Sequence, residues 1–259
     1  MLFLLSPAKS LDTESPVPTP VAPWATEPLF VAQAERLVRV LRRQSVKQVA
    51  ELMDLSPALA ELNTERYARW SAQATEANSK PAVLMFNGDV YDGLQAPSLS
   101  PDDLQWAQQH LVILSGLYGA LRPLDRLQPY RLEMGTALPT PRGRNLYAYW
   151  GDTVAQYLNE RAQAQATPVI VNLASQEYFK VADRPVLRPR VIECVFEDFK
   201  NDRYKVISFF AKKARGLMAR FAITQRLTLP EQLLGFQAEG YAHAPEASGP
   251  DRWVFRRRL

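Results

Sequence analysis

The stretch SPDDLQWAQQHLVIL, residues 100–114, joins a helix pattern directly to a strand pattern. Ser100 followed by a proline is typical of a helix start, and residues 101–109 continue as a helix. Residues 110–114 form an apolar run of the kind found in buried strands. Because strands and helices alternate in this way along the chain, the sequence predicts a mixed α/β (α+β) fold in one domain over residues 1–259.

Other apolar runs predict further strands of a mixed sheet. They lie at residues 2–5, 82–86, 168–173, 191–196 and 204–210. Helix patterns at residues 153–163 and 211–225 would surround this sheet. Ligands of α/β sheets usually bind where the strands end, so the residues that follow these strands are the first candidates for a functional site.

Residues 29–72 predict a helical insertion into this domain. Helical periodicity covers residues 29–43 and 45–53, and Ser56 followed by a proline predicts the start of a third helix. The tight connection before it resembles a helix-hairpin-helix, in which Lys47 and Ser56 would contact a DNA phosphate. That connection lacks the glycines that allow close approach of a DNA backbone, so an ordinary helical corner is an equal alternative.

The composition excludes several classes of protein. The single cysteine, Cys194, cannot form a disulfide within the chain, and the two histidines, His110 and His243, do not supply the ligand spacing of a zinc or haem site. We therefore expect no bound metal ion and no cofactor, with an iron site made of carboxylates alone as the alternative that the composition leaves open. The apolar run at residues 1–5 is too short for a membrane span or a secretory signal, so we expect a cytoplasmic protein with no membrane contact.

Basic residues are unevenly distributed in a chain of net charge +4 and pI near 9.2. Residues 205–226 contain no acidic residue, and residues 256–258 are three arginines. A helix through the first of these stretches places four basic side chains on one arc: Lys212, Lys213, Arg215 and Arg220. Both stretches could face a polyanion, whereas the alternative is the solvated face of an amphipathic helix.

A glycine-containing loop at residues 114–135 follows one of the predicted strands. It carries Arg122 and Arg131, with the acidic residues Asp125 and Glu133 close to them in sequence. Such a loop has the glycines and guanidinium groups that phosphate binding requires. The alternative is that these arginines pair with the neighbouring carboxylates and hold the loop in place.

Polar residues also follow the predicted strands. The candidate members of a polar cleft are Asp89, Tyr91, Glu133, Asn172, Ser175 and Glu177. A carboxylate pair such as Asp89 and Glu177 could perform acid–base chemistry on a nucleotide or a DNA base, which makes an enzyme the alternative function. These residue types also serve as helix caps and turn residues, so a purely structural role is open as well.

Seven segments of the chain, in one order, resemble the YaaA family of peroxide stress proteins. They are residues 5–9, 86–94, 114–135, 149–152, 172–179, 207–218 and 235–241. They extend over about nine tenths of the chain, which makes the resemblance more specific than any single short motif. The resemblance implies a mixed α/β fold with an element similar to a helix-hairpin-helix.

The resemblance also implies a cytoplasmic protein made during hydrogen peroxide stress, which limits iron-driven damage and binds double-stranded or distorted DNA through a basic cleft. The positions that we assign to this cleft are Lys9, Arg122, Arg131, Lys212, Lys213, Arg215 and Arg220. We expect a monomer that binds DNA independently of sequence and without a catalytic step. Tyr118 and Tyr130 would stack on unpaired bases. Any effect on iron toxicity would then be indirect.

Overall fold

A mixed β-sheet forms the centre of the molecule in the computed structural model, which describes residues 1–18 and 21–258. Residues 19, 20 and 259 of the expected domain lie outside these ranges. The sheet has the strand order β11-β12-β9-β8-β1-β5-β6, with β10 paired to β9. Its strands are β1 (Leu2–Leu5), β5 (Leu111–Ser115), β6 (Gly119–Leu121), β8 (Val169–Asn172), β9 (Arg190–Lys200), β10 (Arg203–Lys205), β11 (Ala242–His243) and β12 (Arg252–Arg257).

Strand β1 lies in the middle of the sheet and is parallel to both of its neighbours. Leu4 is in register with Val112 of β5 on one side and with Asn172 of β8 on the other. Strand β9 is parallel to β8 and to β12, whereas β6, β10 and β11 are antiparallel to their partners. The carboxyl ends of β1, β5 and β8 therefore meet at one edge of the sheet.

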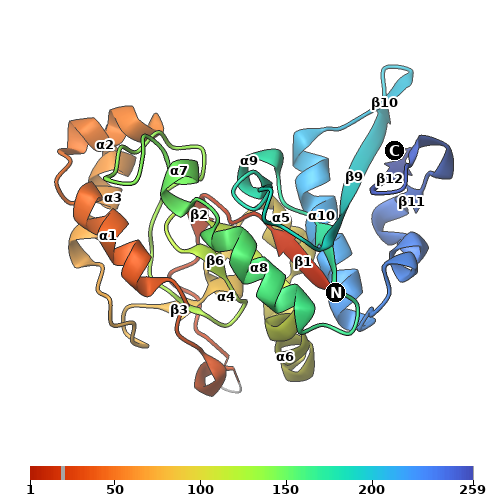
Figure 1. The fold of residues 1–259 in the computed structure, drawn as a ribbon, viewed down its shortest axis with the longest axis horizontal. Coiled ribbons are helices and arrows are strands. Elements are labelled where there is room, and N and C mark those ends of the chain that lie inside the picture. Colours follow the sequence, from red (N-terminus) through yellow and green to blue (C-terminus); the bar gives the residue numbers. More distant parts are fainter. Residues whose placement is uncertain (19–20, 259) are drawn as a thin grey trace.

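Helices surround the sheet and cover its apolar faces (Figure 1). The α-helices are α1 (Val31–Leu41), α2 (Val46–Met53), α3 (Pro57–Arg69), α4 (Ala82–Met85), α5 (Asp89–Leu94), α6 (Pro101–His110), α7 (Leu146–Trp150), α8 (Thr153–Gln163), α9 (Gln176–Phe179) and α10 (Ser208–Thr224). Short 3-10 helices are η1 (Ala22–Trp24), η2 (Ala96–Ser98), η3 (Pro230–Gly235), η4 (Ala238–Gly240) and η5 (Pro245–Ala247). The mixed α/β fold is thus confirmed. No helix in the described part of the chain is long and apolar enough to cross a membrane.

Two-stranded ladders fasten the loops around the sheet. Strand β2 (Ser10–Leu11) pairs with β4 (Phe86–Asn87), and β3 (Lys80–Pro81) pairs with β7 (Arg126–Leu127). The first of these ladders holds the loop that follows β1 against the start of α5. It therefore joins two segments that lie far apart in the sequence.

Three helix starts follow from local capping, as the sequence predicts. The hydroxyls of Ser45 and Ser100 accept hydrogen bonds from the third backbone N–H of α2 and α6, and each forms a complete capping box. The Ser56 hydroxyl accepts from the N–H of Leu59 at the start of α3. Side-chain caps of this kind satisfy donors that a helix leaves free at its first turn.

Two predicted strands are wrong. Residues 82–85 form helix α4 rather than a strand, because the N–H groups of Ala82 and Val83 bond to the carbonyls of Asp125 and Pro123 in a neighbouring loop. A short buried apolar run does not distinguish a strand from a helix. The strand predicted at residues 204–210 stops at Lys205, and α10 begins at Ser208.

The helical insertion packs as one lobe against the rest of the molecule, at the left of Figure 1. Tyr67 of α3 donates its hydroxyl proton to the carbonyl of Arg131. The indole N–H of Trp70 donates to the Tyr118 hydroxyl over 2.8 Å. Helices α2 and α3 are joined at Asp54, which has a left-handed backbone conformation with φ of 50°. The likeness of this corner to a helix-hairpin-helix remains a prediction.

Helices α5 and α10 cross with their backbones in contact, because each has a glycine at the crossing. A Cβ atom on Gly93 of α5 would lie 2.1 Å from the carbonyl oxygen of Lys213. A Cβ atom on Gly216 of α10 would lie 1.8 Å from the carbonyl oxygen of Val90. Both positions therefore require glycine, and the crossing sets the starts of the two helices beside each other.

Candidate functional site

A cavity of about 450 Å³ lies at the carboxyl edge of the sheet. Its walls come from the loop after β1, the start of α5, helix α9 and the first turns of α10. The lining residues are Ser6, Pro7, Ala8, Lys9, Ser10, Asn87, Gly88, Asp89, Val90, Glu133, Ser175, Glu177, Tyr178, Lys212 and Arg215. Polar residues predicted from the ends of separate strands thus meet here. We call this space the sheet-edge cavity.

Hydrogen bonds between strand ends form the floor of the sheet-edge cavity. The N–H of Ser175 donates to the Ser6 hydroxyl over 2.9 Å, and the Tyr91 hydroxyl donates to the Ser6 carbonyl over 3.1 Å. The Asn172 amide oxygen accepts from the N–H of Ala174. Tyr91 and Asn172 are buried, so these two predicted cleft residues support the floor and are not among its lining residues.

The acidic residues on the walls are held by donors of the protein. Glu133 lies between two cations, 3.0 Å from the Lys9 ammonium and 3.1 Å from the Arg131 guanidinium. One Glu177 carboxylate oxygen accepts from the N–H of Gly135 over 2.9 Å. Asp89 lies 3.7 Å from the Lys212 ammonium. The four predicted cleft residues Asp89, Glu133, Ser175 and Glu177 therefore do share one cavity.

Arg215 is the cation in the sheet-edge cavity without an ion pair to any described residue. Its Nε atom is shielded from solvent and has no hydrogen-bond partner among the described atoms. Burial lowers the pKa of this guanidinium below its ordinary value, and the carboxylate of Glu193 on β9 opposes that effect through space. Arg215 is only partly exposed, and a shielded guanidinium nitrogen without a partner is rare in folded proteins, so this residue is the first candidate for binding an anion.

The tyrosines around the cavity remain protonated at neutral pH. Burial is the largest effect on Tyr178 and raises its pKa well above the ordinary range, and the neighbouring carboxylates of Glu177 and Glu133 act in the same direction. Burial likewise raises the pKa of Tyr91. Within residues 1–18 and 21–258, no cluster of three or more His, Cys, Asp or Glu residues is placed to hold a metal ion.

Three of the basic residues predicted to bind DNA have protein partners outside the sheet-edge cavity. Arg122 lies 2.9 Å from the buried carboxylate of Asp125, in agreement with the alternative in which loop arginines pair with nearby acids. Arg220 donates to the last carbonyls of α5, and Lys213 pairs with Glu239. The helix α10 therefore receives its acidic partners from other segments, although it has none of its own.

The arginines at residues 256–258 do not form the polyanion-facing stretch expected from sequence. Arg257 of β12 is buried and lies 2.7 Å from Asp198 of β9, whose side chain is fully buried. Arg256 pairs with Glu197, and the Arg258 guanidinium lies over the Phe199 ring. These arginines hold β12 to β9, a long-range pairing that local sequence patterns do not reveal.

The expected stacking of Tyr118 and Tyr130 on DNA bases is wrong, because these rings are only 1% and 4% exposed. An exposed aromatic residue lies elsewhere: Phe209, near the start of α10, is 56% exposed. It precedes Lys212 by three residues and so lies on the same side of the helix. Phe209 was not predicted as a site residue, because residues 204–210 read as a strand and only the basic side chains of the helix that follows were considered.

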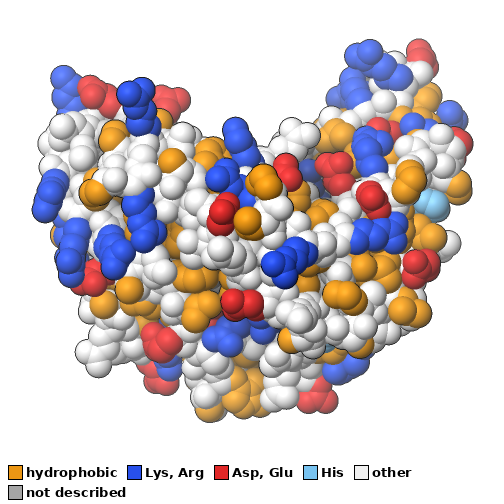
Figure 2. Space-filling model, viewed as in Figure 1, with side chains coloured by type: hydrophobic (Ala, Val, Ile, Leu, Met, Phe, Trp, Pro, Cys, Tyr) orange, Lys and Arg blue, Asp and Glu red, His pale blue; other side chains and the backbone are white. Residues whose placement is uncertain are grey.

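Figure 2 shows the surface hollowed between the helical lobe and the end of the β9–β10 hairpin, with Lys and Arg side chains on both sides. On the lobe, Lys47 and Arg69 are highly exposed and have only long contacts to acidic neighbours, of 3.9 and 3.6 Å. On the hairpin, Lys200 and Arg203 are exposed and have no ion pair among the described residues. We call these two groups the basic shoulders.

The hairpin shoulder was missed in the sequence analysis, although a signal for it is present. Asn201 and Asp202 connect β9 to β10 with positive φ angles of 55° and 58°. Asn and Asp tolerate this left-handed conformation, and a two-residue loop of this kind is typical of a tight hairpin. The turn presents Lys200 and Arg203 beside each other at the tip.

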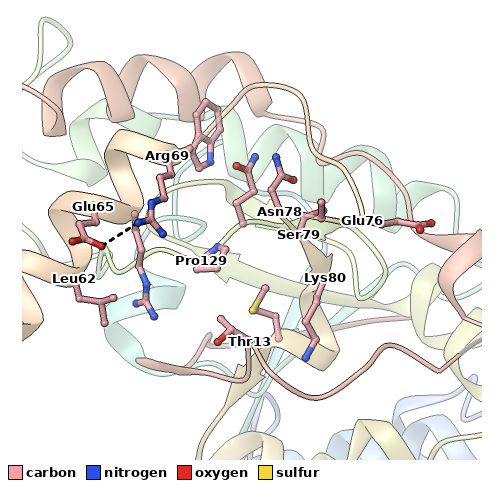
Figure 3. A pocket seen from close by; sticks show the side chains of 14 residues that line it. Thr13, Leu62, Glu65, Arg69, Glu76, Asn78, Ser79, Lys80 and Pro129 are labelled. Atoms are coloured by element: carbon pink, nitrogen blue, oxygen red, sulfur yellow. Dashed lines mark ion pairs between the residues drawn. The ribbon is translucent and has the colours of Figure 1, made fainter.

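A second cavity of about 410 Å³ lies at the base of the helical lobe. Figure 3 shows side chains of α3, including Glu65 and Arg69, on one side of it and Asn78, Ser79 and Lys80 on the other. Arg69 pairs with Glu65 over 3.6 Å, and the Lys80 ammonium donates to the Asp12 carbonyl over 2.8 Å. None of the predicted cleft residues lines this cavity, whereas four of them line the sheet-edge cavity, so we place the candidate site there.

Comparison with known proteins gives consistent matches over the length of the chain. Residues 1–247 match a family model described as peroxide stress protein YaaA. A UPF0246 protein of Leptothrix cholodnii is 66% identical over 99% of this chain and 98% of its own length. UPF0246 proteins of Bordetella pertussis and Paracidovorax citrulli are 62% and 60% identical, each over 100% of this chain and 99% of its own length.

Proposed function

The chain belongs to the family of peroxide stress protein YaaA, and we propose that within the peroxide stress response it binds double-stranded or distorted DNA. The proposed DNA surface is the hollow between the two basic shoulders, with the sheet-edge cavity in its floor. Two observations carry the proposal: Figure 2 shows Lys and Arg side chains on both sides of a hollowed surface, and exposed cations of the helical lobe and of the hairpin have no short ion pairs among the described residues.

The basic shoulders would contact the phosphates of the DNA backbone. Lys and Arg contacts to phosphate release counterions, so they supply affinity that is independent of sequence and weakens as the salt concentration rises. Lys200 and Arg203 have no carboxylate to release before they bind. The long contacts of Lys47 and Arg69 are of the exposed kind that contributes little to stability, so phosphate can replace them at small cost.

The rim of the sheet-edge cavity would contact the same DNA. Lys9 and Lys212 are about half exposed or more, and each faces a carboxylate that a phosphate group can displace. Phe209 beside Lys212 has an exposed ring suited to stacking on an unpaired base. Stacking of this kind would give a preference for DNA with unpaired bases over a plain duplex.

Protection against iron-driven damage would follow from coverage of the DNA. On this proposal the protein binds DNA where iron-driven oxidation occurs, and it does not sequester the iron itself. Tight stoichiometric binding of ferrous iron by the purified protein at physiological salt would contradict this part of the proposal without affecting DNA binding.

The proposal is tested by fluorescence anisotropy with plain and bubbled DNA at several salt concentrations. The variant Lys200→Glu/Arg203→Glu reverses the hairpin shoulder, and Arg188→Glu/Arg252→Glu is the matched control. The two variants change the net charge equally. Arg188 and Arg252 are exposed and lie before the first residues of β9 and at the start of β12, at the opposite edge of the sheet.

We expect the shoulder variant to bind DNA at least about tenfold more weakly and its salt slope to fall by about 2, as for the loss of two phosphate contacts. The control should keep most of its affinity. Equal losses in both variants would show that net charge alone governs binding and would defeat the proposed surface. Phe209→Ala should reduce the preference for bubbled DNA and leave plain duplex binding nearly unchanged.

A further inference from the structure

We infer that the sheet-edge cavity is a binding site for one nucleotide, whose phosphate is held by Arg215 and Lys212 of α10. The inference rests on the proposed function only for one source of that nucleotide, an unpaired residue of a DNA strand. A free nucleoside monophosphate presents the same chemistry and would occupy the same cavity.

Arg215 is a cation in the lining of the cavity. Its Nε–H is shielded from solvent and donates to no described atom, and no described carboxylate forms an ion pair with it. A guanidinium offers several N–H donors in a planar fork, which matches the oxygens of a phosphate. An anion in the cavity would form the ion pair that Arg215 lacks among the described residues, through the guanidinium N–H groups on the cavity side.

Lys212 is a second cation in the lining of the cavity, beside Arg215. Lys212 lies three residues earlier on α10 and therefore on the same side of the helix. Its contact with Asp89 is 3.7 Å long, and both side chains reach solvent. Lys212 can therefore turn to a phosphate at Arg215 without losing a short hydrogen bond. Two cations then meet one phosphate.

The Glu177 carboxylate supplies a hydrogen-bond acceptor in the lining of the same cavity. One Glu177 oxygen accepts from the Gly135 N–H, and the other has no hydrogen-bond partner among the described residues. Amino groups of nucleobases donate to carboxylates, and sugar hydroxyls can do the same. The cavity thus combines an unpaired cation with an unpaired acceptor, which fits a ligand with a phosphate at one end and N–H or O–H donors at the other.

The volume of the sheet-edge cavity suits a single nucleotide. Small-molecule sites commonly have volumes of about 300–1,000 Å³, and this cavity of about 450 Å³ falls within that range. A continuous duplex cannot enter a space of this volume. A single nucleotide can, either free or extruded from a strand, in the way that enzymes acting on bases take up their targets.

The test uses isothermal titration calorimetry with the four 5′-deoxynucleoside monophosphates, the matching nucleosides and inorganic phosphate. The variants are Arg215→Gln, Arg215→Lys and Glu177→Gln, with Arg252→Gln as the matched surface control, and circular dichroism verifies that each is folded. A parallel arm measures anisotropy with a plain duplex and with a duplex that carries a one-nucleotide bulge.

We expect at least one monophosphate to bind and its nucleoside to bind far more weakly. Arg215→Gln should weaken monophosphate binding by about tenfold or more, since a hydrogen bond to a charged group is lost. Arg215→Lys should recover part of that loss, Glu177→Gln should weaken the monophosphate more than inorganic phosphate, and Arg252→Gln should have no effect. The same Arg215 dependence seen only with bulged DNA would assign the nucleotide to a strand and would equally support the inference.

Absence of any Arg215-dependent binding, both of monophosphates and of bulged DNA, would overturn the inference even if plain duplex DNA binds. Equal affinity for nucleoside and monophosphate would overturn the role of Arg215. Monophosphate binding without binding to any DNA would support the inference and defeat the proposed function, so the two failures are distinguishable.

Discussion

The glycine crossing of α5 and α10 gives a prediction whose size follows from the structure. In Gly216→Ala the new Cβ atom would start 1.8 Å from the carbonyl oxygen of Val90, whereas real Cβ contacts lie beyond 3.0 Å. The obstacle is backbone, which cannot rotate away as a flexible side chain would. The two helices must therefore separate by about 1 Å or more, with loss of packing along the crossing.

The expected magnitude is the difference between two effects. Alanine favours a helix interior over glycine by about 1 kcal/mol. Overpacking of a tight contact costs about 1–3 kcal/mol, and a backbone obstacle places Gly216→Ala at or above the upper end. We therefore expect the free energy of unfolding to fall by about 2 kcal/mol or more, and the melting temperature by about 4–8 °C for a chain of this size.

The assay is urea denaturation followed by circular dichroism, with Gly249→Ala as the control. Gly249 has no atom within 4 Å of the position that a Cβ would occupy. The control should unfold within about 0.5 kcal/mol of the unmodified protein. If Gly216→Ala unfolded at the same urea concentration as Gly249→Ala, the helices would not be in backbone contact and the explanation of the crossing would be refuted.

Three further predictions concern groups that are buried or partly buried. Arg257→Ala should lower the free energy of unfolding, measured by urea denaturation, by about 3 kcal/mol or more, because it leaves the fully buried Asp198 without its cation. Arg257→Met combined with Asp198→Asn should recover part of this loss. Burial raises the pKa of Cys194 to about 12, so the native protein at pH 8 should not react with a disulfide reagent. The unfolded protein should react fully, and rapid labelling of the native protein would contradict the burial of Cys194. Burial lowers the pKa of His110, so the unfolded state takes up a proton before the folded state does, and the free energy of unfolding should decrease as the pH falls below 6.5. His110→Asn should flatten this part of a stability profile measured between about pH 5 and pH 8. An unchanged profile would exclude His110 as the source of the decrease.

Features of the fold that depend on neighbouring residues could be predicted from the sequence. The helix starts at Ser56 and Ser100 follow from caps within three residues, and they were confirmed. Strand β12 was missed because its arginines read as a basic stretch that could face a polyanion. Their partners lie on β9, almost sixty residues earlier, as in the pair of Arg257 with Asp198.

The position of the candidate site at the strand ends could be predicted from the sequence, but the pairing of its charged residues could not. Lys9, Ser175 and Glu177 meet in one cavity because parallel strands finish at one edge, which the alternation of strands and helices indicates. Which cations are free was not predictable. Arg122 and Arg220 have partners, whereas Arg215 has none among the described residues, and only three-dimensional packing decides this.

The central position of β1 has a consequence for the order in which the chain folds during synthesis. Leu2–Leu5 is synthesised before both of its neighbours in the sheet, since β5 follows more than a hundred residues later and β8 later still. This apolar strand must remain unpaired while well over half of the chain is made, and pairings of such sequence separation form slowly. The nascent chain therefore carries an unpaired aggregation-prone strand for much of its synthesis, and we expect chaperones that bind nascent chains to cover it.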